Sequence, residues 1–124
     1  MDKYFCLLTG SLIGGLARYE LGSLVQRRWG AGFPWGTLMV NVTGCFIIGI
    51  LNSLAEEKFY LSNHARLLLM TGFCGAYTTF STLILETSDL FKSGEWTRAF
   101  TYAGGSFLMG FLCFRLGSLL GEVI

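Results

Sequence analysis

Four long apolar segments occupy most of this 124-residue chain, and they limit what it can fold into. They cover residues 4–26, 34–54, 65–90 and 99–120. Each reaches the ~20 residues that an α-helix needs to cross the ~30 Å hydrocarbon core of a bilayer. Only 14% of the residues are charged, whereas soluble domains have roughly 25%. The sequence therefore predicts an all-α membrane protein, with residues 1–124 forming one integral membrane domain of four transmembrane helices.

Short polar connections join the four segments, as in a chain of helical hairpins. The distribution of lysine and arginine outside the membrane normally sets the orientation of such a chain. The side of the N-terminus has Lys3, Lys58 and Arg66, and the other side has Arg27, Arg28, Lys92 and Arg98. This small difference leaves two possibilities open. Another feature sets a single orientation, or the chain inserts both ways and assembles as an antiparallel two-fold dimer.

The third apolar segment contains the stretch GFCGAYTTFSTL, residues 72–83, which is rich in glycine and hydroxyl side chains. These residues favour a break in the helix between Gly72 and Thr79. A break at membrane depth frees backbone carbonyls and amides, which are tolerated only where they are buried in protein or line a cavity. The alternative is a continuous glycine-rich helix that packs closely against its neighbours.

Polar side chains occur at membrane depth in each segment. Asn41 lies in the middle of the second segment with Thr37 one turn before it, and Tyr102 and Ser106 are four residues apart in the fourth. Such groups face protein or a water-filled path, because a bare polar group in lipid is costly. Together with Arg18, they are mainly hydrogen-bond donors, which suit an anion. Phenylalanine ring edges, such as that of Phe80, carry partial positive charge and suit an anion too. The alternative is that these groups only join helices.

Other functional classes find little support in the sequence. The chain has no nucleotide-binding motif, hydrolytic triad or metal-ligand cluster, so we expect that it is not an enzyme. Its cysteines fall one in each segment, without the spacing of a metal or redox site. A net charge of +1 and the lack of a solvated domain give no reason to expect a nucleic-acid partner.

Three motifs, GGLARY, GTLMVNVTGCFIIG and GFCGAYTTFST, follow one another on the first three segments. In these motifs, and over essentially its full length, the chain resembles the Fluc (CrcB) family of fluoride channels. The resemblance implies a passive channel for fluoride in the bacterial inner (plasma) membrane. It also implies a multi-pass, dual-topology antiparallel homodimer with two pores, each lined by both subunits.

The resemblance further implies which residues form the site. Those expected in or near the fluoride pathway are Arg18, Thr37, Asn41, Phe80, Ser81, Thr82, Tyr102 and Ser106, with Glu86 near a pore mouth. A structural Na⁺ at the dimer interface would be held by the backbone carbonyls of Gly75 and Thr78. The chain departs from the family pattern at Leu83, where a second pore phenylalanine is usual. Leucine keeps the bulk but lacks the polarised ring edge, so we expect altered fluoride passage.

The residues also allow two other functions. A small dual-topology, proton-coupled exporter would exchange protons for substrate at Glu20, the one carboxylate that could lie deep in a segment. A membrane scaffold would conduct nothing and would tolerate changes at Asn41 and Phe80 as long as the dimer forms.

Overall fold

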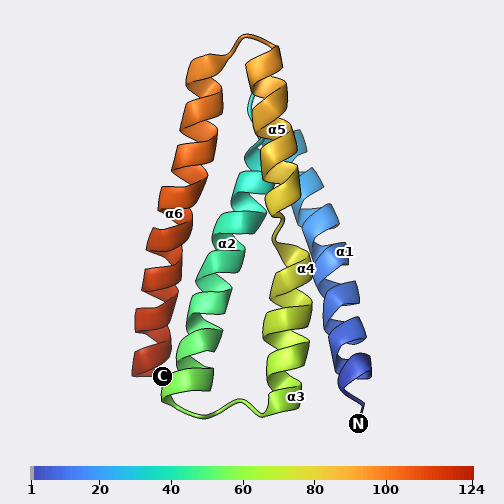
Figure 1. Cartoon of the computed structure of the whole chain (residues 1–124), viewed down its shortest axis with the longest axis vertical. Helices are drawn as coiled ribbons and strands as arrows, with labels where there is room; N and C mark the ends of the chain where they lie inside the picture. The colour runs from blue at the N-terminus through green and yellow to red at the C-terminus, as the bar shows by residue number, and fades with distance from the viewer. Residues whose placement is uncertain (1) are drawn as a thin grey trace.

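The computed structural model describes residues 2–124 as four antiparallel helical passes (Figure 1). The first pass is α1 (Lys3–Trp29), and the second is α2 (Trp35–Asn52) with a π-helical continuation, Ser53–Glu57. The third pass consists of α3 (Asn63–Arg66), a π-helical segment (Leu67–Cys74), α4 (Gly75–Tyr77) and α5 (Phe80–Lys92). The fourth is α6 (Trp96–Val123). The prediction of an all-α chain is confirmed for the described residues.

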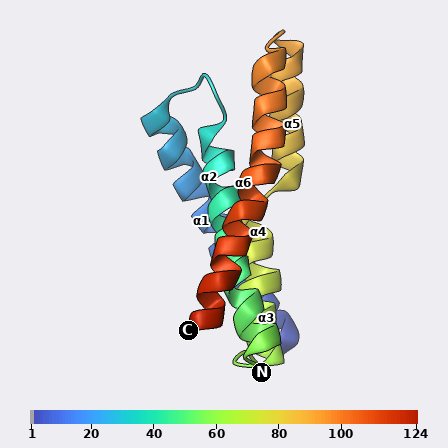
Figure 2. The ribbon, with the colours of Figure 1, turned by 90° about the vertical axis from the view of Figure 1, so that its left-hand side faces the viewer.

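The connections alternate between the two ends of the molecule. Both termini and the connection between α2 and α3 lie at one end, and the α1–α2 and α5–α6 connections lie at the other (Figures 1 and 2). Gly30 and Gly94 follow α1 and α5 with φ of 93° and 77°, a backbone conformation that glycine adopts at little cost. The chain therefore has the up-and-down course that the short connections predict.

Three passes are long and apolar enough to cross a membrane, namely Trp35–Glu57, Asn63–Lys92 and Trp96–Val123. The expected fourth span corresponds to α1, whose 27 residues extend roughly 40 Å at about 1.5 Å per residue. Arg18 and Glu20 make α1 less apolar than the other passes, and it does not meet the same criterion. The structure thus supports a multi-pass membrane protein, with three of the four expected spans identified by length and composition.

The third pass is broken, as the sequence predicts (Figure 1). The break lies at Thr78 and Thr79, at the end of the predicted interval, where both backbones are extended. Thr79 then begins a new helix, because its side-chain oxygen accepts a hydrogen bond from the backbone N–H of Thr82 at 3.2 Å. This capping bond satisfies one of the N–H groups that a helix start leaves without a partner.

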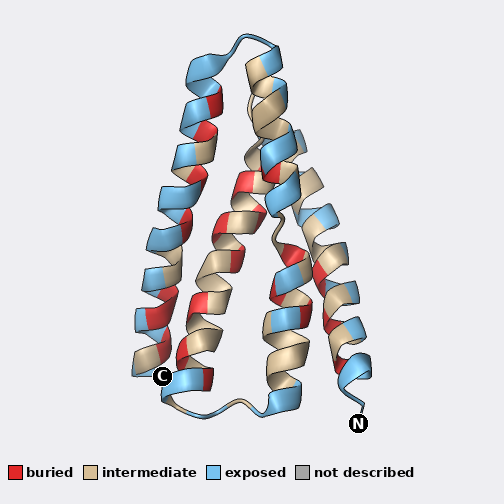
Figure 3. Ribbon diagram, viewed as in Figure 1, coloured by how far each residue is buried: buried red, intermediate tan, exposed pale blue. Residues whose placement is uncertain are grey.

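Glycines allow the passes to approach closely. A Cβ atom on Gly117 in α6 would overlap the carbonyl oxygen of Phe46 in α2, and one on Gly14 in α1 would overlap that of Phe73 in the third pass. Small residues at such contacts are typical of membrane helices, whose association depends on close packing. The buried residues accordingly lie on the facing sides of the passes, while much of their outer surface is exposed (Figure 3).

Candidate functional site

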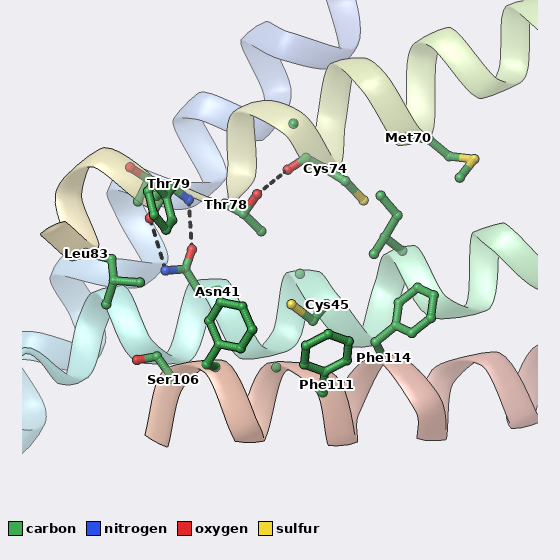
Figure 4. A pocket seen from close by; sticks show the side chains of 16 residues that line it. Asn41, Cys45, Met70, Cys74, Thr78, Thr79, Leu83, Ser106, Phe111 and Phe114 are labelled. Carbon is green, nitrogen blue, oxygen red and sulfur yellow. Dashed lines mark hydrogen bonds between the residues drawn. The ribbon is translucent and has the colours of Figure 1, made fainter. Parts of the chain in front are cut away.

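A cavity of about 500 Å³ lies between α2, the third pass and α6 (Figure 4). Its lining includes Asn41, Phe80, Leu83 and Ser106, which the sequence analysis places in or near a pathway, and Gly75 and Thr78 of the expected cation site. Most of the remaining lining is apolar, with the rings of Phe107, Phe111 and Phe114 on the α6 side. The structure therefore brings together residues from three separate passes around one space.

Asn41 holds the broken third helix in place. Its Nδ2 donates a hydrogen bond to the carbonyl oxygen of Thr79 at 3.1 Å, and the backbone N–H of Thr79 donates to its Oδ1 at 2.8 Å (Figure 4). The amide thus replaces helical partners that the break removes. A primary amide has two N–H donors, so a second donor remains on a residue that lines the cavity.

The same break changes the hydrogen bonding of the expected cation ligands. In a continuous helix, the carbonyls of Gly75 and Thr78 would accept from the N–H groups of Thr79 and Thr82. Those two N–H groups instead donate to the side chains of Asn41 and Thr79. Both carbonyls therefore lose the partners that a continuous helix would give them, and both residues line the cavity.

Ser106 contributes a hydroxyl group that has no partner within residues 2–124. Its Oγ atom is buried and makes no hydrogen bond, although the residue lines the cavity. A buried polar atom without a partner costs about 1–3 kcal/mol, and such atoms are rare in native structures. Ser106 therefore offers an unused hydrogen-bond donor at the wall of the cavity.

Tyr102, one turn before Ser106 on α6, belongs to a second polar group beside the cavity. Its side chain is buried, and its hydroxyl donates to Glu86 Oε1 at 2.8 Å. Thr37 from α2 also interacts with this hydroxyl. The sequence analysis named all three residues but did not predict the bond between Tyr102 and Glu86, because the two residues lie on different helices.

The remaining predicted residues lie outside the cavity lining. Arg18 Nε donates to the carbonyl oxygen of Ala76 at 3.0 Å, so it supports α4 from the α1 side. Ser81 is exposed, and the hydroxyl of Thr82 accepts a hydrogen bond from that of Thr79 at 3.0 Å. Glu20 is exposed on α1. Thr79 was not among the predicted residues, although its position before FSTL is typical of a helix cap.

Comparison with known proteins places this arrangement in a family. The sequence pattern of the family described as "CrcB-like protein, Camphor Resistance (CrcB)" matches residues 5–118. The chain belongs to the CrcB family. The matched region of this CrcB protein includes the cavity lining and the Tyr102–Glu86 pair.

Similar proteins cover nearly the whole CrcB chain. A protein of Maridesulfovibrio salexigens named "Fluoride-specific ion channel FluC" is 41% identical over 100% of this chain and 98% of its own length. A protein of the same name from a strain of Thermus thermophilus is 47% identical over 97% of this chain and 98% of its own. A third protein of that name, from Nitrosococcus oceani, is 42% identical over 90% of this chain and 89% of its own length.

Proposed function

We propose that this CrcB protein is a fluoride-selective channel that lets F⁻ pass the membrane down its electrochemical gradient. Relatives named fluoride-specific ion channels, matched over nearly full length, support this assignment. Within the molecule, the observation that carries the proposal is the buried hydroxyl of Ser106, which lines the cavity without a partner in residues 2–124. This hydroxyl can donate a hydrogen bond to a small anion, because no acceptor in the described protein uses it.

The other lining groups are suited to the same ion. Asn41 keeps a second amide donor after binding Thr79, and Phe80 presents an aromatic ring to the cavity. Edges of aromatic rings carry partial positive charge. Fluoride leaving water needs replacements for its hydration shell, and a narrow set of donors within an apolar wall supplies them while repelling cations.

The proposed assembly is an antiparallel, dual-topology homodimer with two pores, each lined by both subunits. The near-equal distribution of basic residues at the two membrane faces supports insertion in both orientations. Phe80 supports assembly, because its side chain lines the cavity and yet is 69% exposed in a single chain. A second copy placed over this side would cover the ring and complete the wall of the pathway.

The proposed structural cation is Na⁺. Gly75 and Thr78 fit it, because the break leaves their carbonyls without helical N–H partners and hard cations prefer oxygen ligands. Bound Na⁺ would supply positive charge that fixes the broken helix. Two side chains also hold the broken helix in place: Asn41 binds the carbonyl of Thr79, and Arg18 binds that of Ala76.

Replacing Ser106 with alanine tests the donor assignment. We expect Ser106→Ala to slow fluoride release from proteoliposomes by about tenfold to hundredfold, the effect of losing a hydrogen bond worth about 1.5–3 kcal/mol to a charged group. Thermal stability should stay the same or rise, because Oγ has no partner in the described protein to lose and a buried polar atom without a partner is itself destabilising.

Ser118→Ala is the matched control for this prediction. Ser118 accepts a hydrogen bond from Ser53 at its carbonyl, and its hydroxyl is 3.0 Å from that of Ser53. We expect this variant to lower the melting temperature and leave the fluoride rate per folded protein unchanged. Equal release rates for Ser106→Ala and wild type would remove Ser106 from the pathway.

Leu83→Phe tests the role of ring edges. Leu83 is 8% exposed and lines the cavity beside Phe80, and the volume of about 500 Å³ can take a larger side chain. We expect Leu83→Phe to raise the fluoride release rate several-fold, by roughly 1 kcal/mol of added ring-edge stabilisation. Leu83→Met, which keeps an apolar side chain of similar volume without a ring, should leave the rate unchanged. A rate that is the same in all three forms would contradict the ring-edge account at this position.

A further inference from the structure

A second, smaller cavity lies at the end of the molecule where the α1–α2 connection meets the start of α6. Its volume is about 290 Å³, and its lining consists of Trp29, Gly32, Phe33, Trp35 and Arg98. At this end the α1–α2 and α5–α6 hairpins diverge in side view (Figure 2), and Arg98 joins them by donating from Nη1 to the carbonyl oxygen of Gly32 at 2.6 Å. The cavity thus combines one cation with several aromatic rings at the edge of the membrane-spanning passes.

Arg98 retains hydrogen-bonding capacity after its contacts with the protein. Within residues 2–124, its contacts engage Nη1, with Gly32, and Nε, which lies 3.4 Å from Glu95 Oε1. A guanidinium has five N–H donors and keeps its charge at any physiological pH. The two N–H groups of Nη2 are used by neither contact. The Arg98 side chain is 51% exposed, so an ion from solution can reach it.

The cavity adjoins the polar groups of the proposed pathway. Arg98, Tyr102 and Ser106 are spaced four residues apart on α6, so they follow one another along the same face of the helix. Phe33, which lines the cavity, packs edge-on against the ring of Tyr102, with centroids 5.4 Å apart and planes at 83°. The Tyr102 hydroxyl binds Glu86 Oε1 at 2.8 Å, and Ser106 lies one turn further along α6.

We propose that the cavity of Trp29, Phe33, Trp35 and Arg98 is an anion-collecting mouth, where Arg98 gathers fluoride before it passes Tyr102. This inference rests on the proposed channel function and adds an outer binding site to it. A cation in a recess with low-dielectric walls raises the local concentration of anions and their rate of arrival. Such an effect is screened at high ionic strength.

The test measures initial fluoride release from phosphatidylcholine vesicles at low ionic strength, over a range of fluoride concentrations. We expect Arg98→Gln to lower the rate about tenfold at low fluoride, in the range known for electrostatic steering, and to approach the wild-type rate at saturating fluoride. Glu95→Gln should raise the rate at low fluoride, because it removes the carboxylate beside Arg98. Added potassium gluconate should reduce both differences.

Two variants separate charge from structure. Lys92→Gln removes the same charge at the same end of the molecule from a residue that does not line the cavity, and we expect the wild-type rate. Arg98→Lys keeps the charge but not the planar guanidinium that reaches Gly32, and we expect it to retain most of the wild-type rate at low fluoride. Each variant is first checked for the wild-type elution volume in gel filtration.

Several outcomes would overturn the proposal while the channel function stands. One is an Arg98→Gln rate equal to that of Lys92→Gln. Another is an Arg98→Lys rate as low as that of Arg98→Gln, which would assign Arg98 to holding the Gly32 loop. An effect that appears only in vesicles with phosphatidylglycerol would identify an anionic lipid headgroup, and not fluoride, as the ligand of Arg98. If wild type releases no fluoride, the channel function itself fails, and the mouth with it.

Discussion

Asn41→Asp is expected to abolish most fluoride release, lowering the rate by at least about a hundredfold. The aspartate places a negative charge in the cavity wall, where it repels the permeating anion, and it removes the Nδ2 donor that binds the Thr79 carbonyl at 3.1 Å. Each contribution is worth about 1–3 kcal/mol or more in a site shielded from water, and about 1.4 kcal/mol corresponds to tenfold in rate. Fluoride release from proteoliposomes containing equal amounts of folded protein measures the effect.

Asn63→Asp is the control for this substitution. Asn63 is exposed at the first residue of α3, where a negative charge is favourable next to a helix N-terminus. We expect its fluoride rate to equal that of wild type. A channel that tolerates Asn41→Asp with little loss of rate would show that the anion does not pass this side chain, and would favour the scaffold interpretation of the chain.

Gly117→Ala is expected to produce the largest loss of stability among glycine-to-alanine substitutions on α6. The added Cβ atom would overlap the carbonyl oxygen of Phe46, so α2 and α6 would have to separate along a contact that also contains the buried Ser53–Ser118 hydrogen bonds. Overpacking of this kind costs about 1–3 kcal/mol, and more where backbone must move. The melting temperature in detergent and the fraction of protein that elutes without aggregation measure the loss.

Gly105→Ala provides the matched control on the same helix. A Cβ atom at Gly105 meets no atom within 4 Å in the single chain, and alanine favours helix by about 1 kcal/mol over glycine. We expect equal or higher stability for this variant. If Gly117→Ala were as stable as Gly105→Ala, the close approach of α2 and α6 in the structure would be wrong. If Gly105→Ala were instead strongly destabilising, a partner subunit would have to lie against that side of α6.

The fold was largely predictable, because apolar length and short connections leave few arrangements open to a membrane chain. The glycine- and threonine-rich stretch correctly predicts the broken third helix, yet its position at Thr78 and Thr79 depends on a tertiary bond. Asn41 replaces the helical partner of the Thr79 N–H, and no local sequence pattern specifies which residue of a neighbouring helix does so. The sequence analysis also predicted α1 as a span, but Arg18 and Glu20 reduce its apolar character, and α1 is not among the three passes identified as candidate spans.

The sequence named candidate site residues, but their geometry was not predictable from it. Four-residue spacing correctly places Tyr102 and Ser106 on one face of α6, but it does not distinguish their surroundings. Ser106 lines the cavity with an unpartnered hydroxyl in the described chain, whereas Tyr102 is bonded to Glu86. Likewise, the bond from Arg18 to the Ala76 carbonyl was not predicted, and the expectation that Arg18 lies near the pore stays a prediction. These differences depend on how separate passes face one another, which periodicity alone does not give.

The proposed activity is selective passage of fluoride without coupling to protons. The most direct test is release from liposomes that contain the purified protein and hold equal fluoride and chloride, with the same pH on both sides and ion-selective electrodes for both anions. We expect rapid fluoride release when an ionophore dissipates the membrane potential, with chloride retained and no release from protein-free vesicles. Fluoride retention by folded protein, or release only under an imposed proton gradient, would contradict the proposed activity.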